Sequence, residues 1–180
     1  MTDQEPQRRT MQAAADGNGR LAARPKPPAV NRSTGPHPLG LDAARDGWLY
    51  VPDRYRSAQP APLLVFLHGA GGGAHRGKRL FQFIANRTGI LLLVPESRGC
   101  TWDIIRGGFG PDVRFLDQAL AHTFTAYALD AARLALGGFS DGASYALSLG
   151  LANGDLLPIS SRGRQGSRHR RARMAGHACS

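Results

Sequence analysis

Short apolar runs divide the middle of the chain into candidate strands. Residues 63–67 and 90–94 are continuously apolar, as expected of parallel strands that are buried on both faces of a sheet. A third such strand is predicted over 133–137. A shorter one is predicted over 48–51, between a glycine and a proline.

Helical periodicity fills the intervals between these strands. From 113 to 127 apolar residues recur at steps of three and four, which forms one face of a helix, and Pro111 precedes them where a first helical turn tolerates proline. Further helices are predicted over 78–87 and 143–151. The alternation predicts an α/β fold with a mainly parallel sheet, right-handed crossovers and helices on both faces.

The two ends of the chain have a different composition. Residues 1–40 are rich in Gly, Pro and polar side chains without periodicity, so we expect disorder there and an ordered domain over 41–155. Residues 156–180 carry six arginines and no carboxylate, which predicts a basic, disordered tail. The abrupt change of composition leads to the hypothesis that this end comes from a shifted reading frame, which the other two frames of the coding DNA would test.

Charge and cysteine content narrow the classes of partner. The formal net charge of +10 lies mostly in the two ends, and the basic tail lacks interleaved aromatic residues, so nucleic acid is an unlikely partner. Cys100 and Cys179 are the only cysteines and form no metal-ligand motif. No apolar run approaches a membrane span of about 20 residues, and none forms the apolar region of a secretory leader. We therefore expect a cytoplasmic protein with no metal and no cofactor.

A GxSxG motif supplies the first candidate chemistry. It reads Gly138-Phe-Ser140-Asp-Gly142 and lies between a predicted strand and a predicted helix, the setting of a nucleophile elbow. Its glycines allow close backbone packing, so that the serine projects outward. The alternative is an ordinary serine N-cap at the start of a helix.

A glycine-rich loop supplies the second element. The sequence HGAGGG at 68–73 follows the strand at 63–67, which we expect to neighbour the elbow strand. Acyl transfer needs backbone N–H groups aimed at the oxyanion, one from the residue after the nucleophile and one from an earlier loop. These would be the amides of Asp141 and Ala70.

The segments 62–72, 91–96 and 137–144 together resemble the α/β-hydrolase superfamily. Within it they are most similar to the phospholipase/carboxylesterase group and its polyester-depolymerase relatives, over residues 41–155. The resemblance implies that Ser140 attacks a small-molecule carboxylic ester and forms an acyl-enzyme.

The resemblance also implies roles for residues around the serine. The amides of Ala70 and Asp141 would hold the oxyanion. His68, Gly69 and Trp102 would contribute to the substrate site, His68 by shaping the oxyanion loop and Trp102 by lining an acyl pocket.

The remaining triad members are missing from credible positions. In this fold an acid and then a histidine follow the serine. The last carboxylate, Asp155, lies only 15 residues after Ser140, and His169 and His177 lie in the arginine-rich end. We therefore expect a fold without its C-terminal strands. The alternative function is a non-catalytic truncated domain whose basic tail binds an acidic partner.

A dinucleotide-binding Rossmann domain is a further alternative. Gly69 to Ala74 fits GxGxxG/A after a strand, and Glu96 lies 22 residues further on, near where a ribose-binding acid is expected. The strand ends in His68 rather than running into the first glycine, which argues against this reading. A P-loop is excluded because Arg79 occupies the Ser/Thr position.

Overall fold

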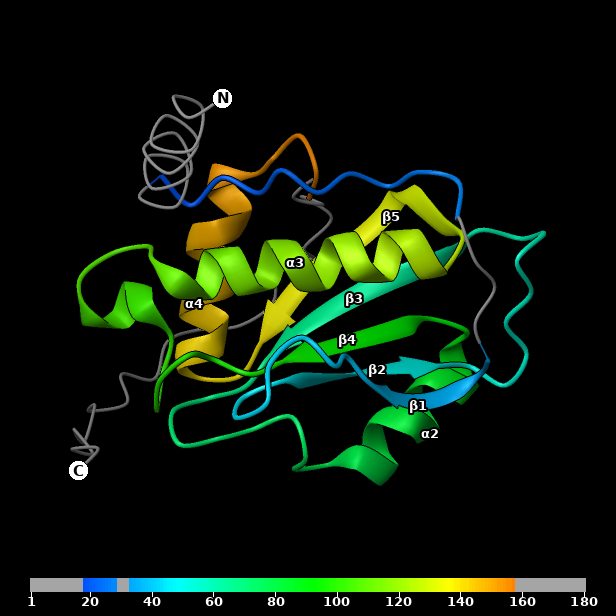
Figure 1. Ribbon diagram of the computed structural model, residues 1–180, viewed down its shortest axis with the longest axis horizontal. Helices are drawn as coiled ribbons and strands as arrows, with labels where there is room; N and C mark the ends of the chain where they lie inside the picture. The colour runs from blue at the N-terminus through cyan, green and yellow to red at the C-terminus, as the bar shows by residue number, and fades with distance from the viewer. Residues whose placement is uncertain (1–17, 29–32, 158–180) are drawn as a thin grey trace, which may run out of the picture.

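The computed structural model describes residues 18–28 and 33–157 (Figure 1). We call residues 18–28 the N-terminal segment. The expectations for residues 1–17, for 29–32 and for the basic end from residue 158 lie outside the described residues.

A five-stranded sheet forms the centre of the molecule, in the order β1-β2-β4-β3-β5. The strands are β1 (Gly35–Pro38), β2 (Gly47–Val51), β3 (Ala61–Leu67), β4 (Leu91–Pro95) and β5 (Leu129–Gly138). β2 is antiparallel to both β1 and β4, whereas β3 is parallel to β4 and to β5. The described sheet is therefore mainly parallel, as predicted.

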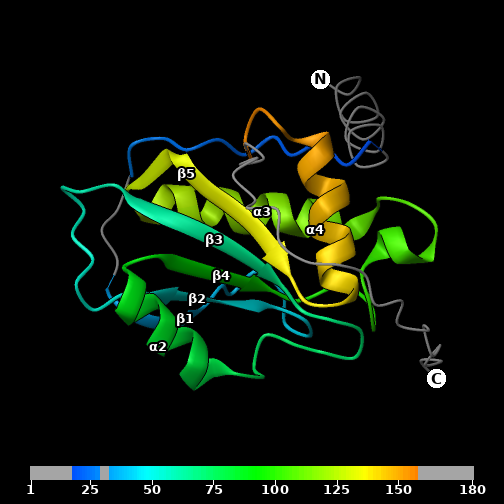
Figure 2. The same ribbon diagram turned by 180° about the vertical axis from the view of Figure 1, so that it is seen from behind.

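Helices cover both faces of this sheet, which confirms the predicted layers. Helix α2 (Lys78–Thr88) contacts β2 and β4 on one face, and it lies in front of the sheet in Figure 2. Helices α3 (Pro111–Ala126) and α4 (Asp141–Ala152) lie on the other face (Figure 1). A short 3-10 helix, η1 (Asp103–Arg106), precedes α3 and was not predicted.

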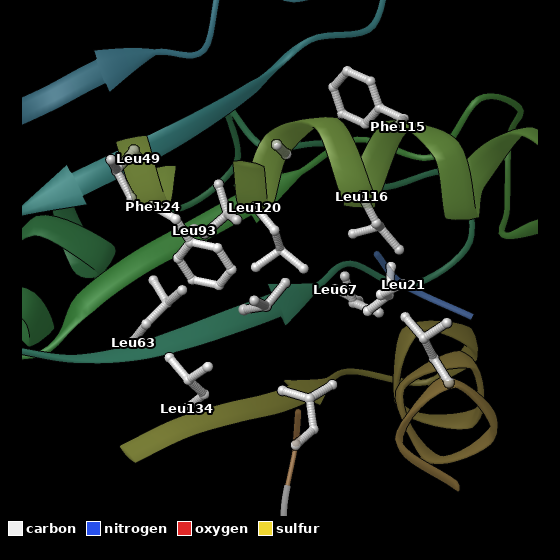
Figure 3. Packing of buried hydrophobic residues seen from close by; sticks show 14 of the residues in the cluster. Leu21, Leu49, Leu63, Leu67, Leu93, Phe115, Leu116, Leu120, Phe124 and Leu134 are labelled. Atoms are coloured by element: carbon white, nitrogen blue, oxygen red, sulfur yellow. The ribbon is translucent and has the colours of Figure 1, made fainter. Parts of the chain in front are cut away.

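The main core lies between the sheet and the helices α3 and α4 (Figure 3). The predicted apolar face of α3 is buried there, because side chains three and four residues apart lie on one side of a helix. The core side chains include Leu49, Leu63, Leu67, Leu93 and Leu134 from the sheet and Leu116, Leu120 and Phe124 from α3.

The expectation that order begins at Leu41 is wrong for the residues that the structure describes before it. Strand β1 pairs with β2, and the N-terminal segment packs along α3 and α4 with Leu21 buried. The Leu21 N–H donates to Asn153 Oδ1 at 2.8 Å, and the next two amides donate to Asp117 Oδ1 at 2.7 Å. These side-chain acceptors satisfy the backbone of a segment that has no regular structure of its own.

Strand β5 is the edge of the described sheet. Its outer side has no strand partner within residues 18–28 and 33–157, as expected for a fold without its later strands. The predicted boundary at 155 is two residues early, since Leu156 and Leu157 are both buried.

Candidate active site

Ser140 occupies the turn between β5 and α4 in a strained backbone conformation. Its φ of 53° and ψ of −122° make it the one non-glycine residue with positive φ in the described part of the chain. Such a conformation costs on the order of 1–3 kcal/mol and persists only where the surroundings impose it. The serine is exposed and makes no side-chain capping bond, so the ordinary N-cap reading lacks the hydrogen bond that would support it.

Close backbone packing against β3 imposes this turn. The Phe139 N–H donates to the carbonyl of Leu67 at 3.0 Å and so extends the β3–β5 pairing that was predicted. A Cβ at Gly142 would lie 2.2 Å from the Leu67 oxygen, and one at Gly138 would lie 2.5 Å from the Gly142 carbonyl carbon. Only glycine fits at these two positions, which explains the spacing of the motif around Ser140.

The glycine-rich loop after β3 lies directly against this turn. A Cβ built on Gly69 would be 3.3 Å from the Cβ of Ser140. The N–H of Asp141 is the first of α4 and has no acceptor within the helix. In the described residues neither this amide nor that of Ala70 donates to another protein group.

His68 is buried at the start of this loop and both of its ring nitrogens are engaged. Nδ1 lies 2.7 Å from the Gly69 carbonyl, and the Ser97 N–H donates to Nε2 at 3.1 Å. These partners place the proton on Nδ1. Burial lowers the pKa of His68, so the ring is neutral. His68 therefore shapes the loop and is not placed to take a proton from Ser140.

The loop after β4, residues 97–102, is hydrogen-bonded both to the glycine-rich loop and to the first residue of α4. Its Cys100 carbonyl accepts from the Gly71 N–H at 2.7 Å. The Thr101 hydroxyl donates to Asp141 Oδ2, also at 2.7 Å. Sequence reasoning missed Thr101, since a lone threonine in a loop carries no pattern that points to a distant carboxylate.

Trp102 is a structural part of the same loop. Its Nε1–H donates to the His68 carbonyl at 2.8 Å, and its indole lies between the rings of His68 and Tyr145. No part of the side chain is exposed. The expected position in the wall of an acyl pocket is therefore not observed, because this loop turns the indole into the core.

A cavity of about 390 Å³ opens beside the glycine-rich loop. His68, Gly69 and Ala70 of this loop line the cavity. The sheet, α2 and the elbow contribute four apolar side chains, namely Phe66, Val94, Phe81 and Phe139. The site thus combines an exposed serine, two unpaired amides and an apolar cavity.

A base for Ser140 is not found among the described residues. No hydrogen bond joins its Oγ to any side chain in 18–28 and 33–157. Asp155 instead forms ion pairs with Arg20 and Arg24, at 3.1 and 2.6 Å. The candidates His169 and His177 lie outside the described part.

Two further kinds of feature are absent from the described part of the chain. No group of three or more His, Cys, Asp or Glu side chains is arranged there to hold a metal ion. None of its helices has the length and hydropathy needed to cross a bilayer.

The dinucleotide reading of the glycine-rich loop has little structural support. Helix α2 begins at Lys78, four residues after Ala74, whereas the dinucleotide motif opens its helix within the glycine pattern. Glu96, the expected ribose-binding acid, is buried, and its Oε1 accepts from the Ala74 N–H at 3.1 Å. This hydrogen bond helps to hold the glycine-rich loop in place.

Comparisons with known proteins agree with this geometry. No protein-family model matches the sequence, and no curated protein does so. Several solved structures are similar in fold. A thermostable esterase has a TM-score of 0.52 at 18% identity, covering 63% of this chain and 35% of its own. Acetyl xylan esterase from Aspergillus awamori has a TM-score of 0.53 at 18% sequence identity, and the match covers 68% of this chain and 49% of the esterase. An acylaminoacyl peptidase from Pyrococcus horikoshii has a TM-score of 0.50 at 20% sequence identity, and the match covers 70% of this chain and 22% of the peptidase.

This chain thus matches less than half the length of each of these three proteins. Identities at this level carry information about the fold and not about the reaction. These likenesses concern the arrangement of the mainly parallel sheet and its covering helices. The described residues form part of an α/β-hydrolase fold.

Proposed function

We propose that this chain carries the nucleophile and oxyanion site of a serine hydrolase that acts on carboxylic esters. The observation that carries the proposal is the backbone of Ser140, held at a φ of 53° in an exposed turn against the Gly69-Ala70 loop. Strained backbone conformations cluster at active sites, where they present a side chain for chemistry.

The proposed reaction assigns a step to each group. Ser140 Oγ attacks the ester carbonyl carbon, and the N–H groups of Ala70 and Asp141 bind the oxyanion that forms. Collapse of the tetrahedral intermediate expels the alcohol and leaves an acyl-enzyme, which water hydrolyses. This chemistry requires neither a metal nor an organic cofactor.

The attack also requires a base for the Ser140 proton. Since no described side chain is hydrogen-bonded to Ser140 Oγ, we expect the serine in this chain to react slowly. The choice of an ester as the substrate class belongs to this proposal, and two of the solved structures of similar fold are esterases by name.

Fluorophosphonate labelling followed by mass spectrometry tests this proposal. We expect a covalent adduct on Ser140 that Ser140→Ala abolishes, and added imidazole should raise its rate of formation by accepting the proton. Ser144→Ala is the matched control, because Ser144 is also exposed and lies on the first turns of α4. An adduct that survives in Ser140→Ala would contradict the proposal, and an unlabelled wild-type protein would favour the non-catalytic alternative.

A further inference from the structure

The cavity beside the glycine-rich loop has apolar walls and one charged side chain. The rings of Phe66 and Phe81 lie with centroids 5.4 Å apart, and Val94 and Phe139 complete the apolar lining. Its volume of about 390 Å³ is near the lower end of the range for small-molecule sites. The charged side chain is Arg76, which is exposed.

Arg76 and one of the two proposed oxyanion donors both border this cavity. Ala70, whose amide is the proposed oxyanion donor, lines it, and Phe139 precedes the nucleophile. Two turns separate Ala70 from Arg76, closed by the Gly72 N–H to the Gly69 carbonyl and by the Arg76 N–H to the Gly73 carbonyl. An acyl group in the cavity would therefore have its carbonyl near Ala70, and Arg76 would supply a cation in the lining of the same cavity.

The Arg76 guanidinium is not used by the fold. In the described residues it forms no ion pair and no side-chain hydrogen bond. The Glu96 carboxylate contacts the same loop, but it accepts from the Ala74 N–H and lies 3.8 Å from both His75 and Arg45. The cavity thus presents a cation without a carboxylate partner from the described protein.

We propose that this cavity takes the acyl group of an ester whose far end carries a carboxylate, and that Arg76 binds this carboxylate. The substrate class would be monoesters of small aromatic or aliphatic dicarboxylic acids. The aromatic walls suit an apolar acyl body, and a guanidinium binds a carboxylate through two parallel N–H bonds. This inference rests on the proposed function, because that function places the ester carbonyl at Ala70.

Binding of benzoate and of its neutral analogue benzamide tests the inference, measured by NMR titration of the full chain. We expect Arg76→Gln to weaken benzoate binding about tenfold, the loss of one charge-assisted contact, and to leave benzamide binding unchanged. Arg79→Gln is the matched control, since Arg79 is an exposed arginine that does not line the cavity. It should leave benzoate binding unchanged.

Three results would overturn the inference: no benzoate binding, equal binding of benzoate and benzamide by wild-type protein, or equal losses in both arginine variants. Benzoate contains no ester and does not require an activated serine. Its binding in Ser140→Ala should therefore match wild type, and a failure of fluorophosphonate labelling would count against the proposed function alone.

Discussion

Replacing Gly142 with alanine tests whether backbone packing imposes the serine turn. The added Cβ would lie 2.2 Å from the Leu67 oxygen and 2.4 Å from the His68 oxygen, where real contacts are not found below 3.0 Å. Both obstacles are backbone atoms of β3 and its following loop, so α4 and β3 must separate. Overpacking of this kind costs about 1–3 kcal/mol, and we expect a loss of at least about 2 kcal/mol in the free energy of unfolding.

Urea unfolding followed by circular dichroism measures this loss, with Gly150→Ala as the matched control. Gly150 belongs to the same helix, but a Cβ there meets nothing within 4 Å. Alanine at that position should stabilise the protein by about 0.5–1 kcal/mol through helix propensity. If Gly142→Ala were as stable as wild type, the close approach of α4 to β3 would not be what holds Ser140 in place.

Two further predictions concern the loops around the turn. Thr101→Val removes the hydroxyl that donates to Asp141 Oδ2 and should lower the free energy of unfolding by about 1–2 kcal/mol in urea, whereas Thr101→Ser should restore it. Burial lowers the pKa of His68, so the unfolded chain takes up the proton first as the pH falls below about 6.5. Stability should therefore be full above that pH and decrease below it, and urea unfolding across the range should show a flatter dependence in His68→Gln. An equally steep dependence in His68→Gln would show that another group titrates.

Local periodicity was sufficient to predict the elements that pack by a regular face. The apolar residues of α3 recur at helical spacing, so the burial of that face follows from the sequence alone. The order of the N-terminal segment could not be predicted in this way. Its amides are satisfied by Asp117 and Asn153, which are 95 and 132 positions away from their donors.

The candidate active site also contains residues whose positions the sequence did not predict. Trp102 was expected to line a pocket, and only the fold of its loop shows that the indole donates to His68 and lies in the core. Arg76 carried no motif, and its importance follows from the cavity that it borders.

The sequence by itself determined the turn at Ser140. The spacing of glycines two residues before and two residues after the serine predicts the turn, although the close approach of α4 to the backbone of β3 is what requires them. The pairing of β3 with β5 was expected, but tertiary structure alone decided that the loop after β4 also meets this turn, where the Thr101 hydroxyl donates to Asp141 Oδ2. Contacts between loops far apart in sequence depend on strand order, and no local pattern of side chains encodes that order.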